Sequence, residues 1–114
     1  MAEAVKPKEI VIYQDKEGHE PFTTWLNKLR DISGRRRILT RLRRLEQGNY
    51  GDCEPVGEGL SELRLFFGSG YRVYFGEDAH NIIIILCGGD KGSQKKNIKF
   101  AKLCWKAYIE NDKE

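Results

Sequence analysis

The sequence predicts a small α+β domain in which helices pack on a mostly antiparallel, four-stranded sheet. Three observations lead to this prediction. Two helical stretches follow an early strand-like segment, three short strand-like runs come next in close succession, and a further helical stretch follows them. The expected element order is β-α-α-β-β-β-α, in one domain that spans residues 1–114 and has its core at about residues 9–110.

The first half of the chain contains the early strand and a predicted helical hairpin. Residues 9–13 (EIVIY) form the strand. In residues 20–31 the apolar side chains recur at i, i+3, i+4 and i+7, as on one face of a helix. Ser33 is the expected N-cap of a second helix, which runs to about Gln47 and ends before Gly48. We expect most arginines to lie on the outer surface of this hairpin.

The second half begins with a predicted loop, because residues 49–59 contain four glycines or prolines among eleven residues. Short breaks with turn residues then separate three strand-like runs, which is typical of an antiparallel meander. The pair Gly88-Gly89 is expected to end the last strand. These strands are predicted at residues 61–67, 71–76 and 81–87, and the last helix at residues 94–110.

Composition excludes several classes of protein. With 39% hydrophobic and 32% charged residues in 114, the chain has the composition of a soluble globular domain. Its longest apolar run, residues 82–87, is far shorter than the ~18 residues of a membrane span. The first residues (MAEAVKPKE) do not have the pattern of a signal peptide, so we expect a cytoplasmic protein without membrane contact. Three cysteines without CxxC spacing predict free thiols, and neither a disulfide framework nor a metal site.

Charge is distributed unevenly along a chain whose net charge is only +3. Residues 28–44 carry eight basic residues and one acid, and residues 91–106 carry six lysines and no acid. Residues 46–62 between them carry five acids and no base. Two basic segments indicate a surface for a polyanion or for an acidic protein partner, with a merely solvated helix face as the alternative.

No motif of a nucleotide-binding loop, a zinc protease or a serine hydrolase occurs in the sequence. A combination of chain length, element order and three short segments is more informative. These segments are residues 63–65 (LRL), 70–75 (GYRVYF) and 86–96 (LCGGDKGSQKK). With them, the chain resembles the RelE/ParE superfamily of bacterial toxins and, within it, the HigB-like addiction-module killer proteins. The resemblance covers about residues 9–110.

This resemblance implies the toxin of a type II toxin–antitoxin pair, with a cognate helix-turn-helix antitoxin of the HigA-like kind. RelE-type toxins cut messenger RNA on the ribosome, whereas ParE-type toxins share the fold and inhibit DNA gyrase. We therefore predict a ribosome-dependent mRNA endonuclease that inhibits translation without metal or cofactor, with the ribosome and mRNA as partners. Two alternatives are a gyrase inhibitor without nuclease chemistry and a decayed toxin that only binds its antitoxin.

The resemblance places three cations in the predicted catalytic site. Arg72 matches the phosphate-stabilising arginine of the superfamily, and a guanidinium suits that role because its planar fork binds phosphate oxygens and stays charged. Its structural alternative is an ion pair with Glu62 or Glu77. Arg64 and Glu62 match two lysines of RelE-like enzymes, so Glu62 reverses the charge. For Glu62, we favour a structural role in an ion pair with Arg64 over a role as general base. Lys91 matches a further phosphate-contacting arginine.

Other residues are predicted to bind RNA. Strand alternation places Tyr74 on the same face as Arg72, where it could stack on a base or pack in the core. Lys95 lies near the position of a late tyrosine in RelE. The arginine-rich helix has three open interpretations, namely contact with ribosomal RNA, contact with an acidic antitoxin segment, or a solubilising face. The predicted RNA- or ribosome-binding residues are Arg36, Arg37, Arg41, Lys95 and Tyr74.

Overall fold

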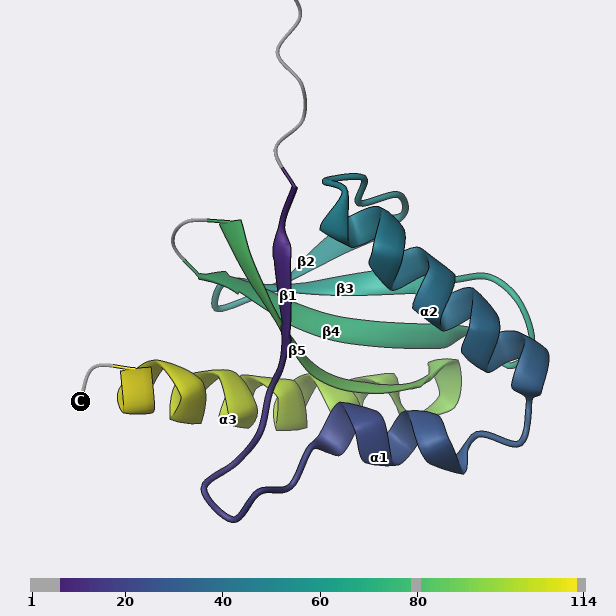
Figure 1. Cartoon of the computed structure of the whole chain (residues 1–114). Coiled ribbons are helices and arrows are strands. Elements are labelled where there is room, and N and C mark those ends of the chain that lie inside the picture. Colours follow the sequence, from purple (N-terminus) through teal and green to yellow (C-terminus); the bar gives the residue numbers. More distant parts are fainter. Residues whose placement is uncertain (1–6, 79–80, 113–114) are drawn as a thin grey trace, which may run out of the picture.

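The structure is a computed structural model of the chain that describes residues 7–78 and 81–112 (Figure 1). It is a mixed α+β fold with one five-stranded sheet and three α-helices. In chain order the elements are β1 (Glu9–Ile12), α1 (Pro21–Lys28), α2 (Ile32–Glu46), β2 (Cys53–Gly57), β3 (Leu60–Leu65), β4 (Tyr71–Asp78), β5 (Ile82–Asp90), the short 3-10 helix η2 (Lys91–Ser93) and α3 (Gln94–Asp112).

The strands lie in the order β1-β5-β4-β3-β2, and every neighbouring pair except β1 and β5 is antiparallel. The mostly antiparallel sheet is therefore confirmed, but it has five strands instead of four. The additional strand is β2, inside the segment predicted to be a loop. It lies at the sheet edge and pairs with β3, with Cys53 opposite Leu63 and a register shift between Pro55 and Gly57. An edge position tolerates proline and glycine, which is why composition alone did not predict this strand.

Strand β5 continues through Gly88 and Gly89, so the prediction that this pair ends the strand was wrong. A Cβ atom on Gly88 would collide with the Trp25 ring of α1, and one on Gly89 would collide with the Asn97 side chain of α3. The two glycines therefore allow a helix to approach the strand from either side.

The N-cap of helix α2 is Asp31 and not Ser33, which corrects the prediction. The Asp31 carboxylate accepts a hydrogen bond from the Gly34 backbone N–H at 2.8 Å, as an N-cap side chain does. Its other oxygen accepts a hydrogen bond from the Tyr71 hydroxyl of β4 at 2.9 Å. The cap therefore also ties the start of α2 to the sheet.

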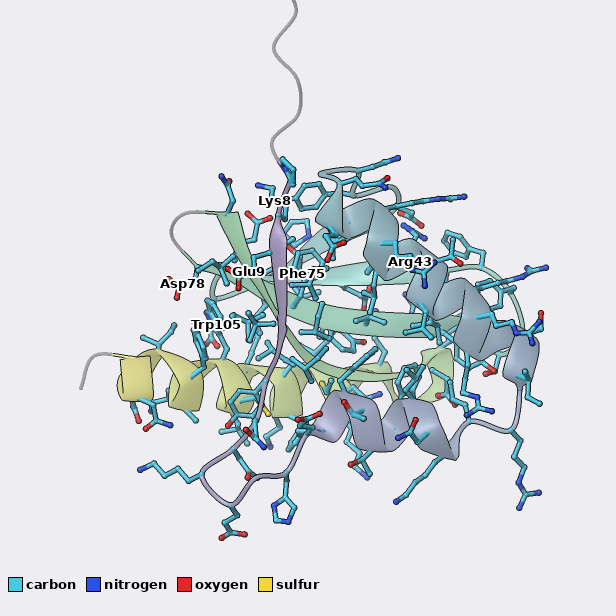
Figure 2. All side chains as sticks on the ribbon, in the orientation of Figure 1. Lys8, Glu9, Arg43, Phe75, Asp78 and Trp105 are labelled. Carbon is cyan, nitrogen blue, oxygen red and sulfur yellow. The ribbon has the colours of Figure 1, made fainter. Side chains whose placement is uncertain are left out.

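Two hydrophobic cores lie on opposite faces of the sheet. Helices α1 and α2 cover one face, where Ile38 and Leu45 pack against strand residues such as Val73. Helix α3 covers the other face with Cys104 and Trp105, and Trp105 projects from α3 toward the strands (Figure 2). All three cysteines are free. Among the described helices, none has the length and apolar character needed to cross a bilayer.

Candidate functional site

A buried carboxylate lies at the centre of the candidate site. Glu62 of β3 is 0% exposed, although it is ionisable. It accepts hydrogen bonds from the side chains of Arg64, Arg72, Tyr74 and Gln94. We call these five residues the Glu62 cluster. A buried charge requires this kind of compensation, because water no longer solvates it.

The register of β3 and β4 brings the cluster together. Glu62 lies opposite Tyr74, and Arg64 lies opposite Arg72. Because residues two apart on a strand share a face, all four side chains lie on the face that α3 covers. Gln94 comes from the first turn of α3. The sequence-based prediction included the strand residues, but no pattern indicated Gln94.

The hydrogen bonds divide between the two carboxylate oxygens of Glu62. Arg64 Nε and Arg72 Nη1 donate to Oε1 at 2.9 and 3.2 Å. The Tyr74 hydroxyl donates to Oε2 at 2.9 Å. The Gln94 Nε2 amide spans both oxygens, at 3.2 Å to Oε1 and 2.9 Å to Oε2. Glu62 therefore holds two guanidinium groups side by side.

The electrostatics of the cluster fix its protonation states. Burial by itself would raise the pKa of Glu62, but hydrogen bonds from Arg64, Gln94 and Tyr74, with the Arg72 charge, hold it below the usual value. The hydrogen bond to Glu62 raises the pKa of Arg64. Burial and then the hydrogen bond to Glu62 raise the pKa of the Tyr74 phenol far above its usual value. At neutral pH the cluster therefore holds two cations and one anion.

Both structural alternatives raised for Glu62 and Arg72 are present. Glu62 pairs with Arg64, as favoured, and its lowered pKa argues against a general base. Arg72 pairs with Glu62 and not with Glu77, which accepts a hydrogen bond from Tyr50. A phosphate-binding role for Arg72 has to coexist with this ion pair.

The two arginines differ in how far they reach solvent. The Arg64 side chain is 32% exposed and also lies 4.0 Å from Glu54 of β2. The Arg72 side chain is only 10% exposed, so it is not a surface residue. Its Nε atom is buried and has no hydrogen-bond partner within residues 7–78 and 81–112. Buried donors nearly always have an acceptor, so the unpaired Arg72 N–H is an exception among the described residues.

The predicted lysines lie at the edge of this site. Lys91 is exposed on η2, and its Cβ would lie 3.4 Å from a Cβ placed on Gly70 in the β3–β4 turn. Lys95 is exposed on the first turn of α3, next to Gln94. In the described part of the chain, neither lysine forms a salt bridge with the Glu62 cluster.

Among the predicted RNA-binding residues, Tyr74 has the surroundings that are least compatible with binding RNA. Its side chain is 0% exposed and packs with Leu60 and Ile84, while its hydroxyl group bonds to Glu62. Complete burial leaves no ring face for a base to stack on. Of the two alternatives open for Tyr74, the structure shows core packing.

The predicted arginines of α2 lie on the other side of the sheet and have different surroundings. Arg36 is exposed, and the Arg37 guanidinium lies 4.9 Å from the centre of the Phe67 ring. Arg43 is likewise exposed on α2 (Figure 2). A hollow of about 310 Å³ beside the helix is lined by Arg37, Thr40, Arg41, Arg44, Leu65 and Phe67. We call these residues, with Arg36, the α2 surface.

Arg41 has a structural role that the amino-acid sequence did not indicate. Its guanidinium donates hydrogen bonds to three backbone carbonyls, at 2.7 Å to Arg64, 3.0 Å to Asp52 and 3.3 Å to Tyr50. These bonds fasten α2 to β3 and to the segment before β2. Arg41 therefore has few donors left for RNA, in contrast to Arg36.

Comparison with known proteins shows a similarity to a bacterial protein. The chain is 46% identical over 82 residues to an uncharacterized protein of Haemophilus influenzae (strain ATCC 51907 / DSM 11121 / KW20 / Rd). The match covers 72% of this chain and 83% of that protein. No family model matches the chain.

Proposed function

The chain belongs to the same family as the Haemophilus influenzae protein, and we propose that it is the toxin of a type II toxin–antitoxin pair. In this proposal it has a RelE-like fold and is a HigB-like, ribosome-dependent mRNA endonuclease that acts in the cytoplasm. Its partners are the ribosome, mRNA and a helix-turn-helix antitoxin. The element order supports the fold assignment, with β2 as an edge strand added to the four expected strands.

The observation that carries the proposal is the pair of guanidinium groups on adjacent strands. Arg64 and Arg72 lie directly opposite each other, and a single carboxylate bonds to both. One negative charge cannot neutralise two positive charges. The five residues of the cluster therefore carry a net positive charge, as an anion site requires, and the half-exposed Glu54 carboxylate 4.0 Å from Arg64 offsets only part of it.

Cleavage of RNA by internal transfer requires such a site. The 2′-oxygen loses its proton and attacks the adjacent phosphorus, the bond to the 5′-oxygen breaks, and that oxygen takes up a proton. Negative charge accumulates on the phosphate oxygens in the transition state, where fixed cations stabilise it. We assign this stabilisation to Arg72 and Arg64, with Lys91 positioning the RNA at the edge of the site. Glu62 holds both guanidinium groups in place.

The test is a purified translation reaction on a defined message, with RNA ends mapped by primer extension. We expect cuts at the codon in the ribosome's decoding site, reduced at least ~100-fold by Arg64→Ala and by Arg72→Ala. Arg30→Ala is the matched control, because Arg30 is an exposed arginine outside the Glu62 cluster. Thermal unfolding of each variant separates lost chemistry from lost folding, which matters most for buried Arg72.

An intact message, with active ribosomes and folded protein, would contradict the nuclease proposal. The second candidate is then the gyrase inhibitor, which needs the fold but no phosphate chemistry. Two observations favour it, because Glu62 engages both arginines and Tyr74 is buried. A DNA supercoiling assay with the same protein tests that candidate directly.

A further inference from the structure

A second surface, further along α3, is separate from the Glu62 cluster. A hollow of about 660 Å³ lies between α3 and the turn that joins β2 to β3. In Figure 1, α3 follows the end of β5 and runs below the strands, away from α2. The side chains that line the hollow include Glu58, Lys99, Lys102, Leu103, Lys106 and Ile109, which we call the α3 surface.

The centre of the α3 surface is aliphatic and uncovered. Leu103 is 62% exposed, in the middle of a 19-residue helix whose opposite face is packed against the sheet. Ile109, further along the helix, is half-buried, packs against the core on the sheet side and also lines the hollow. The buried Trp105 also lines the hollow, and its ring stacks on Tyr108 with 5.5 Å between ring centres and 8° between planes. An exposed leucine beside further apolar lining residues is a feature of protein-binding surfaces.

Lysines surround this apolar centre. Lys99 and Lys106 are exposed, and Lys102 Nζ would lie 3.5 Å from a Cβ on Gly57, so it is near the β2–β3 turn. None of the three forms a salt bridge within the described ranges. Glu58 and Glu110 also line the hollow, which leaves its rim with an excess of positive charge.

We propose that the α3 surface binds an acidic amphipathic helix of a protein partner. Leucine-type side chains on that helix would cover Leu103 and Ile109, and its carboxylates would pair with Lys99, Lys102 and Lys106. A groove between a helix and a turn, with apolar residues at the centre and charge at the rim, suits this mode of binding. RNA fits less well, because aliphatic side chains give its phosphates and bases no partner.

This inference does not rest on the proposed nuclease activity. The residues of the α3 surface are distinct from those of the Glu62 cluster, and the closing experiment measures binding without a ribosome. Failure of one proposal therefore leaves the other unaffected.

The experiment is an NMR titration of the ¹⁵N-labelled full chain with three synthetic peptides of equal length. The first is an acidic amphipathic helix with a leucine stripe among glutamates. The second replaces its glutamates with lysines, and the third replaces its leucines with glutamines. We expect saturable shifts around Leu103 and Ile109 with the first peptide only. Both the apolar stripe and the negative charge are needed for the proposed contacts.

Variants then locate the binding site. Leu103→Ser and Lys102→Glu should each weaken binding of the first peptide about 10-fold or more, as for central interface residues. Lys28→Glu at the end of α1 is the charge-matched control and should leave the affinity unchanged, because Lys28 is exposed and lies outside the α2 and α3 surfaces. Leu103 and Lys28 are exposed, so these substitutions should leave the fold intact, and thermal unfolding checks this.

Three results would overturn the proposal. One is the absence of binding at millimolar peptide, and another is equal binding of the first and third peptides, which would show charge attraction alone. The last is displacement of the first peptide from Leu103 by oligouridylate. That result would assign the surface to RNA.

Discussion

The Glu62 cluster and the α2 surface are both rich in arginine, but the arginines of the cluster are paired with a carboxylate and most arginines of the α2 surface are not. In the cluster, Arg64 and Arg72 are tied to one buried carboxylate between two strands and a helix. On the α2 surface, Arg36 and Arg44 are exposed, and no arginine of α2 forms a salt bridge within residues 7–78 and 81–112. Arginine side chains therefore stabilise the fold in the Glu62 cluster, whereas the exposed ones on the α2 surface are accessible to a binding partner.

This difference shows that the burial of an arginine, and not the number of arginines nearby, decides whether its substitution changes stability or only the surface charge. Removing a partner from the cluster leaves another charge unpaired in the interior, so it costs stability. Removing an exposed arginine changes the surface potential and leaves the fold intact. Arg41 is intermediate, since it belongs to the α2 surface but bonds to three backbone carbonyls.

The largest effect on stability is expected for Glu62→Ala. The substitution leaves Arg72 buried without its ion pair and also removes the acceptor for Tyr74 and Gln94. We expect a loss of about 3–5 kcal/mol of unfolding free energy, measured by urea denaturation.

Glu54→Ala is the matched control for this prediction. Its carboxylate lies 4.0 Å from Arg64 and is about half exposed (53%), so the loss should stay below about 0.5 kcal/mol. Equal losses for the two variants would show that the buried and exposed charges do not differ as argued.

An intermediate effect is expected for Arg41→Ala. The three carbonyls that accept from Arg41 would lose a charged donor, and α2 would lose its tie to the segment before β2. We expect a loss of about 1.5–3 kcal/mol by urea denaturation.

Arg43→Ala on the same helix is the control for Arg41, because Arg43 is exposed. Its effect should remain within about 0.5 kcal/mol. If Arg41→Ala were equally mild, Arg41 would return to the set of residues available to RNA.

Much of the fold was predictable because its signals are local. The helical periodicity of residues 20–31 and the spacing of the three strand-like runs both correspond to elements that the structure contains. Strand β2 was not predictable, because pairing with β3 overrides a turn-rich composition. The same holds for Gly88 and Gly89, where the need for glycine comes from Trp25 and Asn97, far away in the sequence.

The candidate site was predictable only in part. Strand alternation places Glu62, Arg64, Arg72 and Tyr74 on one face, as the structure shows. Alternation does not reveal how deeply a face is covered, so the burial of Tyr74 and Arg72 required the position of α3. Gln94 completes the cluster from another element, and no spacing in the sequence connects it to Glu62.

The smallest effect on stability, and the sharpest test of the comparison, is expected for charge reversal on the α2 surface. Arg36→Glu should change the unfolding free energy by no more than about 0.5 kcal/mol, since its side chain is exposed. Arg37→Glu should change it by no more than about 1 kcal/mol, because it also removes the cation–π contact with Phe67. If the α2 surface contacts ribosomal RNA, both should weaken ribosome binding and reduce its salt dependence by about one unit of slope per lost phosphate contact.

The identity of the partner decides how the α2 result is interpreted. Sedimentation with ribosomes at several salt concentrations measures the slope, and Lys102→Glu on α3 is the charge-matched control. An unchanged slope in the Arg36 and Arg37 variants would remove ribosomal RNA as the partner of this surface and leave an acidic protein segment. A slope reduced equally by Lys102→Glu would show that the ribosome senses only the total charge of the protein. Only a loss specific to α2 would establish that the exposed arginines form a surface with a function of its own.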